Sequence, residues 1–512
     1  MKYLLLIPLS ALLIMTTDSK RSSSSEPYDP VFGVFDNSTD VGDVMHQGSA
    51  EYDPETGEYR LKGSGFNMWG DTDEMRFLWK ALQGDFILRA EVDFIGDGVD
   101  PHRKIGWTVR NSLDPHSAMA NGTLHGDGLI SLQYRTTYKD ETQQVVSPDS
   151  NATIIQLERR GDTFLLSTAK KGKAFTTVKV DSLMLKDQVF AGIYVCSHNA
   201  DVVEEAVFKN VRIIKPAPEE LEQYREYLGS RLEVLDLETG TRTVLLESEH
   251  SIQAPNWTND GSTLIYNSHG LLYNFDLETG EVSHLNTGFA TDNNNDHVLS
   301  FDGSLIGISH HNAEDDGNST IYLLPVNGSD SLTQVSRSGV GASYLHGISP
   351  DNSTVIFTGF RNGKYDLYAA DTQTMEETQL TDTPGLDDGS EFSPDGKTIY
   401  FNSTRTGTMK LWKMNADGSE PTQLTFDDAY NDWFPHLSPD GKWIVFLSFG
   451  TDVDPAAHPF YKHVTLRKMP ATGGEPEIIA YVYGGQGTIN VPSWSPDGRK
   501  IAFVSNSGAY YQ

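Results

Sequence analysis

Cysteine is almost absent from the 512-residue chain, in which Cys196 is the only one. A single cysteine cannot form an intrachain disulfide. It lies in the apolar run VFAGIYVCSHN, and an isolated cysteine in such a run is usually a small buried hydrophobic residue. We therefore expect a buried strand thiol without chemical reactivity.

Positive charge is also scarce. The chain has 39 basic and 71 acidic residues, a formal net charge of −32 at pH 7. A surface this acidic repels nucleic acid and anionic lipid. We therefore expect neither as a partner.

Long hydrophobic runs are confined to the N-terminus, MKYLLLIPLSALLIMTTDSK. One lysine precedes an apolar run that ends near Met15, too short to span a bilayer and typical of a secretory signal peptide. We assign residues 1–20 to this peptide, leave its cleavage point open, and read RSSSSEP as a flexible spacer. No transmembrane segment is expected elsewhere. The sequence thus predicts an exported monomer, periplasmic or secreted.

Helix signals are nearly absent from residues 27–215. This region instead has alternating runs such as FILRAEVDF, KIGWTVRNS and TFLLSTAKK. Alternation of this kind predicts a sandwich of antiparallel strands. The segment APEELEQYREYLG, preceded by Pro216, is the one plausible helix, and we expect residues 216–229 to form a linker helix.

The second half carries an internal repeat. A turn motif of the SPDG type begins at residues 258, 300, 349, 393, 438 and 495, a period of roughly 45 residues that is typical of propeller blades. Each turn precedes a β-branched run such as KTIYFNS or KWIVFLS. The two strands in 230–248 would complete the last repeat from the other end of the array. The predicted fold class is therefore all-β, with a six-bladed propeller over 230–512 preceded by the sandwich.

Aligning the blades on this turn brings unusual residues to one register. Three residues before the turn, blades two and three have His297 and His346, and two residues before it, blades four and five have Glu391 and His436. The link into the first strand of each blade opens on the face opposite the SPDG turns. These four side chains would therefore meet at the central channel. Each one alone is more often a hydrogen-bonded structural residue than a ligand; their shared register is what favours a site.

Two long loops fall on the same face, SHHNAEDDGNST (309–320) and FGTDVDPAAHPFYKH (449–463). We assign His310, His311, Glu391 and His436 as candidate catalytic residues. Trp433, Phe434, Asp388, Asn490 and Arg361 are the candidate substrate-binding residues. For Trp433 and Phe434, simple core packing is the alternative to stacking on a sugar ring.

The repeats SPDGKTIYF (393–401) and SPDGKWIVF (438–446) resemble those of TolB-like β-propellers with PD40 repeats. The stretches NDWFPHLSPDGKW and GGQGTINVPSWSPDG resemble more closely the subgroup of these propellers that is found in polysaccharide-degrading bacteria, to which the oligogalacturonate lyases are a related family. The latter family has seven blades, against six here, and implies a divalent metal held by His and Gln. Carried over by position, His297, His346, His436 and Gln486 would be the ligands of manganese, zinc or calcium, with Glu391 as an alternative to Gln486. No organic cofactor is implied.

The N-terminal stretches GSGFNMWGDTDEMRFLWKALQGDFILRAEV and PHRKIGWTVRNSLDP are similar to concanavalin A-like domains of the DUF1349 type, which often accompany carbohydrate-active enzymes. Trp69, Trp79 and Trp107 would stack on sugar or fill the sandwich core.

Two functions remain open. One is an exported lyase or hydrolase that binds an oligo- or polysaccharide, with the metal as Lewis acid and a His or carboxylate as base. The other is a non-catalytic TolB-like propeller that binds a glycan or an envelope protein. The repeats contain no GxSxG motif, and no HExxH or Walker-type loop is found, which argues against a peptidase or a nucleotide-binding enzyme.

Overall fold

The computed structural model describes residues 31–508. The predicted signal peptide lies outside the described residues. Within them, no helix is long and apolar enough to cross a membrane. Strands dominate, and the helix found among them is the single turn η1 (Ala313–Asp315).

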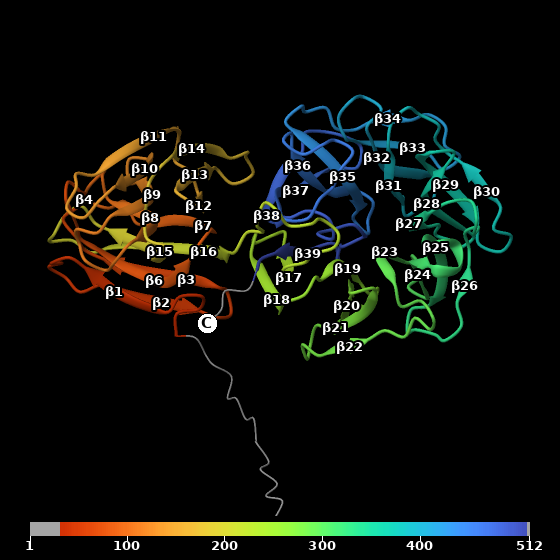
Figure 1. Cartoon of the computed structure of the whole chain (residues 1–512), viewed down its shortest axis with the longest axis horizontal. Helices are drawn as coiled ribbons and strands as arrows, with labels where there is room; N and C mark the ends of the chain where they lie inside the picture. The colour runs from red at the N-terminus through yellow and green to blue at the C-terminus, as the bar shows by residue number, and fades with distance from the viewer. Residues whose placement is uncertain (1–30, 509–512) are drawn as a thin grey trace, which may run out of the picture. The chain divides into compact units, whose positions relative to one another are not determined.

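The N-terminal region forms two large antiparallel sheets, as the alternating runs predict (Figure 1). The first consists, in order across the sheet, of β1 (Asn37–Val41), β6 (Met75–Gln83), β15 (Gln188–Cys196), β8 (Lys104–Arg110), β9 (Met119–His125), β10 (Leu129–Arg135) and β11 (Gln143–Ser150). The second consists of β14 (Thr176–Val180), β13 (Thr163–Ala169), β12 (Ile154–Arg160), β7 (Phe86–Ile95), β16 (Glu204–Ile214), β3 (Glu58–Gly63) and β2 (Ser49–Asp53). A small hairpin of β4 (Met68–Trp69) and β5 (Thr72–Asp73) accompanies them.

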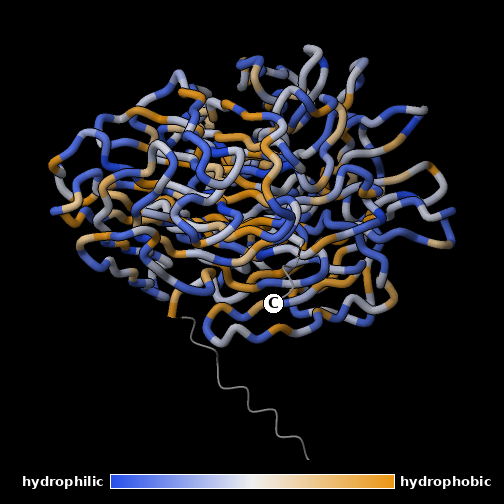
Figure 2. The backbone as a smooth tube through the Cα atoms, turned by 60° about the vertical axis from the view of Figure 1, so that its left-hand side comes forward, coloured by the Kyte–Doolittle hydropathy of each residue, from blue (hydrophilic) through white to orange (hydrophobic). Residues whose placement is uncertain are grey.

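A single hydrophobic core fills the space between these two sheets. Trp107, Phe86 and Phe164 are fully buried within it, which settles the role of Trp107 in favour of core packing. Cys196 is buried too, and burial raises the pKa of its thiol to about 11, so it stays protonated as expected. In Figure 2 most hydrophobic stretches of the chain lie inside the mass of the tube, and many of the outer loops are hydrophilic.

The C-terminal region is a six-bladed propeller, also as predicted. Five of its blades have four strands each. Blade one consists of β19 (Gln253–Trp257), β20 (Thr263–Ser268), β21 (Leu271–Asp276) and β22 (Val282–His284), and blade two of β23 (Asn293–Leu299), β24 (Leu305–Asn312), β25 (Asn318–Pro325) and β26 (Thr333–Gln334). Blade three consists of β27 (Ser343–Ile348), β28 (Thr354–Arg361), β29 (Lys364–Asp371) and β30 (Glu377–Gln379), blade four of β31 (Asp387–Phe392), β32 (Thr398–Ser403), β33 (Lys410–Asn415) and β34 (Thr422–Gln423), and blade five of β35 (Tyr430–Leu437), β36 (Trp443–Gly450), β37 (Lys462–Pro470) and β38 (Glu477–Gly484). The inner strands β19, β23, β27, β31 and β35 surround the centre of the ring (Figure 1).

The sixth blade is built from both ends of the array. Its strands are β18 (Arg242–Ser248), β17 (Ser230–Asp236) and β39 (Lys500–Asn506), and β17 pairs with β39 from Ser230–Asn506 to Asp236–Lys500. A bridge between Trp494 and Ile501 marks the place of its inner strand. This pairing closes the ring by joining the two ends of the array in one sheet.

The SPDG segments form the expected turns. In blade five, Asp440 accepts hydrogen bonds from the hydroxyl of Ser438 (2.6 Å) and the backbone N–H of Lys442 (3.1 Å), and Gly441 adopts a positive φ of 66°. Aspartate fixes its own turn in this way, and glycine alone tolerates that φ without strain. The motif is therefore structural.

The predicted linker helix at 216–229 is wrong. These residues form turns, with a left-handed residue at Tyr224 (φ 66°). Instead of bonding along a helix, the backbone N–H groups of Ala217 and Leu228 donate to the hydroxyls of Tyr483 and Tyr461 (2.9 and 2.7 Å). Contacts with these tyrosines override the local helical tendency.

Candidate functional site

The inner strand of every four-stranded blade has a β-bulge shortly before its SPDG-type turn. The pairing with the second strand shifts between Gln253 and Asn256, Asn293 and His297, Leu345 and Gly347, Asp388 and Glu391, and Trp433 and His436. A bulge re-aims the side chains next to it and is common beside binding sites. Here the bulges turn the side chains beside them toward the adjacent blades.

Three ionisable side chains from consecutive blades gather at these bulges, and we call Asp296, His346 and Asp388 the channel group. The Nε2 atom of His346 lies 3.0 Å from Oδ1 of Asp388. The same carboxylate oxygen accepts hydrogen bonds from the hydroxyl of Thr358 (2.5 Å) and the backbone N–H of Gly389 (2.8 Å). The three residues are only 6 to 8% exposed. The channel group is thus a fixed, largely dry cluster of charge.

The pKa values of the channel group diverge. Burial would raise the pKa of Asp388, but the neighbouring His346 outweighs it and lowers the value to about 2. Burial would lower the pKa of His346, but Asp388 and Asp296 outweigh it and raise the value. For Asp296, burial and repulsion by Asp388 exceed the attraction of His346 and raise the pKa to about 6. The group therefore combines an ion pair with a carboxyl that titrates near neutral pH.

Side-chain amides continue the polar network. Asn295 donates to Gln253 (2.8 Å), Gln486 donates to Asn295 (3.3 Å), and Asn490 donates to Gln486 (2.8 Å). We call these four residues the amide chain. It joins blades one and two to the segment that enters blade six. Because each amide can both donate and accept, the chain presents both kinds of partner beside the channel group.

The long loop of blade five reaches the same place through His458. Its ring packs edge-on against Trp433 and Phe434, at centroid distances of 4.5 and 5.5 Å. Burial lowers the pKa of His458, although Asp388 and Gln486 oppose this. His458 is therefore a neutral ring between the channel group and the amide chain.

Trp433 and Phe434 are 0% and 1% exposed. Neither ring has a face open to a ligand, so their assignment as a stacking platform is wrong and the alternative of core packing holds. They support His458 and the inner strand β35 instead.

Glu391 and His436 form a second buried pair. The Nδ1 atom of His436 lies 2.7 Å from Glu391, and its Nε2 lies 2.5 Å from the backbone oxygen of Ile489. Glu391 also accepts from the backbone N–H of Leu437 (2.9 Å). Both ring nitrogens of His436 are thus occupied. This pair joins blades four and five to the strand segment of blade six.

These contacts bear on the metal implied by the resemblance. A metal ligand needs a free nitrogen lone pair, and His436 has none left. His297 is only 1% exposed; its Nε2 contacts the oxygen of Ile265 at 3.4 Å, and its Nδ1 has no hydrogen-bond partner. Burial lowers its pKa to about 4. In residues 31–508, a metal-compatible group of three His, Cys, Asp or Glu side chains occurs in the sandwich and not in the propeller. Because His297, His346 and His436 belong to no such group within the described residues, the carried-over residues do not fit this metal site.

The other predicted site residues stand apart from the channel group. His310 packs against Phe289 and Tyr322, and His311 contacts the oxygen of Gly317 at 3.3 Å. Arg361 pairs with Glu377 at 3.1 Å, which ties β28 to β30. Within residues 31–508, no hydrogen bond, ion pair or ring contact links these three residues to the channel group.

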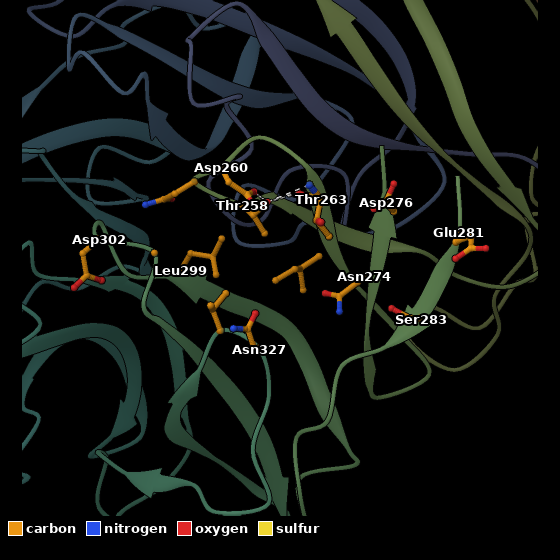
Figure 3. Close-up of a pocket in the computed structure, with 14 residues that line it drawn as sticks. Thr258, Asp260, Thr263, Asn274, Asp276, Glu281, Ser283, Leu299, Asp302 and Asn327 are labelled. Atoms are coloured by element: carbon orange, nitrogen blue, oxygen red, sulfur yellow. Dashed lines mark hydrogen bonds between the residues drawn. The ribbon is translucent and has the colours of Figure 1, made fainter. Parts of the chain in front are cut away.

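A cleft of about 470 Å³ lies between blades one and two on the turn face (Figure 3). Its floor includes Ile265, Leu299 and Val326, and its rim is acidic. The three aspartates that line it accept hydrogen bonds within their own turns: Asp260 from the hydroxyl of Thr258 (2.7 Å), Asp276 from the backbone N–H of Thr279 (2.8 Å) and Asp302 from the hydroxyl of Ser300 (2.6 Å). The cleft contains none of the predicted site residues. We therefore place the candidate site at the channel group.

Sequence reasoning found His346, Asp388, Gln486 and Asn490 but missed Asp296, His458, Asn295 and Gln253. The signal for two of these, Gln253 and Asn295, was present in the same alignment. Five residues before each turn, the blades have Gln253, Asn295, Tyr344, Asp388, Trp433 and Asn490, a register richer in polar side chains than the one chosen.

Comparison with known proteins gives matches to the propeller. The family model described as TolB beta propeller domain matches residues 341–456. An uncharacterised protein of Agrobacterium fabrum strain C58 is 42% identical over 279 residues, which cover 54% of this chain and 92% of that protein. The solved structure of a protein assigned as TolB in Agrobacterium tumefaciens is 40% identical, covers 56% of this chain and 100% of its own, and superposes with a TM-score of 0.52. An oligogalacturonate lyase in complex with manganese reaches 14% identity and a TM-score of 0.35 over 74% of this chain and 96% of its own, too low to support an inference about function.

Proposed function

Because the chain belongs to the TolB-like β-propeller family, we propose that it is an exported binding protein whose propeller holds a glycan over the channel group. The observation that carries this proposal is the buried set of Asp296, His346 and Asp388, which three adjacent blades bring together at matching bulges. A cluster of ionisable side chains with perturbed pKa values marks a candidate functional site.

The chemistry of the network favours a polyhydroxylated ligand. Sugar hydroxyls both donate and accept hydrogen bonds. Asp388 accepts, protonated His346 donates, and the amide chain does both. With a net charge of −32, the protein would repel an acidic glycan unless a cation accompanied it, so a neutral glycan is the better match.

A second candidate is chemical processing of that glycan. It is favoured by the divergence between the two carboxyl groups, with pKa values of about 6 for Asp296 and about 2 for Asp388. Paired carboxyl groups with separated pKa values allow one to act as an acid while the other stays ionised. In this version the glycosidic bond is hydrolysed: Asp296 donates a proton to the leaving oxygen, a water molecule adds to the sugar carbon and releases a proton to solvent, and Asp388 holds His346 in its charged form.

Export is part of the proposal. It is supported by the apolar N-terminus of residues 1–20, which is typical of a signal peptide. Expression of the full chain with cell fractionation tests it. Protein in the periplasm or medium with a shortened N-terminus supports export, and full-length protein retained in the cytoplasm contradicts it.

The binding proposal is tested with purified protein lacking residues 1–20 on an array of neutral and acidic glycans, followed by calorimetric titration of any glycan retained. We compare wild type with Asp388→Asn and His346→Gln, both of which remove the buried ion pair. His284→Gln is the matched control, because His284 lies exposed on the outer strand β22.

The two channel variants are expected to bind at least tenfold more weakly, whereas His284→Gln binds as wild type does. A charge-assisted hydrogen bond to a ligand is worth about 1.5–3 kcal/mol, which corresponds to a factor of ten or more. Retention of no glycan would overturn the carbohydrate class and favour an envelope protein as partner. Equal binding by wild type and both channel variants would show that the glycan binds away from the channel group.

A further inference from the structure

A group of side chains in the N-terminal sandwich has no part in the propeller site. We propose that His102, His125 and Asp127 bind a divalent transition-metal ion of the zinc type. Their potential ligand atoms all lie within 4.8 Å of one another. Two imidazoles and one carboxylate are a ligand set that suits zinc and leaves a fourth position for water.

The backbone holds these residues together before any ion arrives. His125 ends β9, and Asp127 lies in the turn that leads to β10. In this turn the N–H of Asp127 donates to the oxygen of Pro101 (2.8 Å), and the N–H of Gly126 donates to the oxygen of Arg103 (2.9 Å). These bonds tie the turn to the residues on either side of His102. The site is therefore preorganised by main-chain contacts on both of its edges.

His125 supplies the second, independent indication of a ligand. It is only 6% exposed, yet its Nδ1 has no hydrogen-bond partner within the part of the chain that the structure describes. The amide nitrogen of Gln133, which can only donate, lies 3.3 Å from Nε2, and the amide oxygen of Gln133 has no partner among the described residues. Turning this amide over lets Nε2–H donate to its oxygen, so that Nδ1 carries the lone pair that a metal needs. A buried ring nitrogen without a partner is unfavourable unless something fills its place.

His102 and Asp127 supply the solvent-exposed side of the site. Their side chains are 52% and 40% exposed, and Nδ1 of His102 lies 3.9 Å from Oδ2 of Asp127. The other oxygen of Asp127 accepts from the N–H of Leu129 (3.0 Å), which leaves Oδ2 for a ligand. Ligands at about 2.1 Å from a tetrahedral ion stand about 3.4 Å apart. Small rotations of two exposed side chains would therefore close the site around an ion.

One positive charge opposes the ion. The Nζ atom of Lys104 is bonded to Asn67 (2.9 Å) and His198 (3.2 Å). The negative charges of Asp127, which acts on His125, and of Asp100, which acts on Lys104, offset this positive charge in part. We therefore expect micromolar rather than nanomolar affinity.

The test uses untagged protein without residues 1–20, freed of metal by chelation. Zinc is titrated by calorimetry, and cobalt is added as a spectroscopic probe, since tetrahedral cobalt with nitrogen and oxygen ligands absorbs visible light. The variants are His102→Ala, Asp127→Asn and His125→Ala. His116→Ala is the matched control, because Nδ1 of His116 also lies 3.9 Å from an aspartate, Asp71, without a third ligand.

We expect one equivalent of zinc to bind wild type and His116→Ala, with at least tenfold weaker binding in His102→Ala and Asp127→Asn and a loss of the cobalt bands. Those two variants change exposed side chains, so they keep the fold even if His125→Ala does not. Wild-type binding no tighter than that of His102→Ala would overturn the proposal. So would an equal loss in His116→Ala, since it would show adventitious binding by surface histidines. Neither result bears on glycan binding by the propeller.

Discussion

Replacement of Asp296 by Asn is expected to stabilise the propeller at neutral pH. In the folded protein the pKa of Asp296 is raised from its ordinary value of 3.8 to about 6, mainly by burial. A carboxyl whose folded pKa lies above its unfolded one favours folding only while it is protonated. Its contribution is therefore present below pH 3.8 and is lost as the pH rises through about 6. Above that, the ionised group opposes folding by about 3 kcal/mol, at about 1.4 kcal/mol per pKa unit.

Asparagine has nearly the same shape and carries no charge, so the variant avoids this penalty. At pH 7.5 we expect a gain of about 3 kcal/mol in the free energy of unfolding, or about 6 °C in the midpoint of thermal unfolding for a domain of this size. At pH 4.0 the wild-type group is protonated when folded, and the gain should nearly vanish.

The assay is thermal unfolding followed by circular dichroism, at both pH values, for wild type, Asp296→Asn and Asp292→Asn. Asp292 is an exposed acid in the same segment and serves as the control for a change in net charge. A midpoint for Asp296→Asn that is equal to or below that of wild type at pH 7.5 would refute the reasoning. The same refutation would follow from a gain of equal size at both pH values.

Three further predictions concern the scaffold. Deletion of residues 230–248 should abolish the cooperative unfolding transition of the propeller, because β17 and β18 close its ring; a fragment that melts near the parent temperature would contradict closure. Asp73→Ala should destabilise the sandwich by about 3–5 kcal/mol in denaturant unfolding, because it leaves the fully buried Arg110 and Arg135 without their carboxylate partner; a change below 1 kcal/mol would contradict this. Limited proteolysis should cut first within 216–229 and release two stable pieces, as mass spectrometry would reveal, whereas cuts spread over both regions would count against two separately folding domains.

The sequence was sufficient for the architecture. The SPDG-type turns are fixed locally by Ser, Asp and Gly, so their period alone predicts six blades. The closing blade could be predicted as well, because the strand patterns at both ends of the array were each incomplete. The prediction of a linker helix failed, since the conformation of this segment depends on Tyr461 and Tyr483, which lie more than 200 positions away along the chain.

The site was less accessible to sequence reasoning. Its residues depend on a bulge in each inner strand, and one extra residue in a strand exchanges the two faces. The alignment therefore singled out His297 and His436, which lie outside the channel group, and missed Asp296, which the irregularity in β23 brings into it. His458 reaches the site on a long loop, whose path no periodicity reveals. Aromatic character alone could not distinguish the buried Trp433 from a stacking platform.

The central claim is that the channel group binds the ligand, and it is tested most directly by the pH dependence of glycan affinity. The measurement is calorimetric titration from pH 4.5 to 8 of a glycan retained on the array, with wild type and Asp296→Asn. If the glycan lies over the channel group, the wild-type affinity should change with an apparent pKa near 6, and this change should be missing from Asp296→Asn. Identical pH profiles for the two proteins would contradict the account.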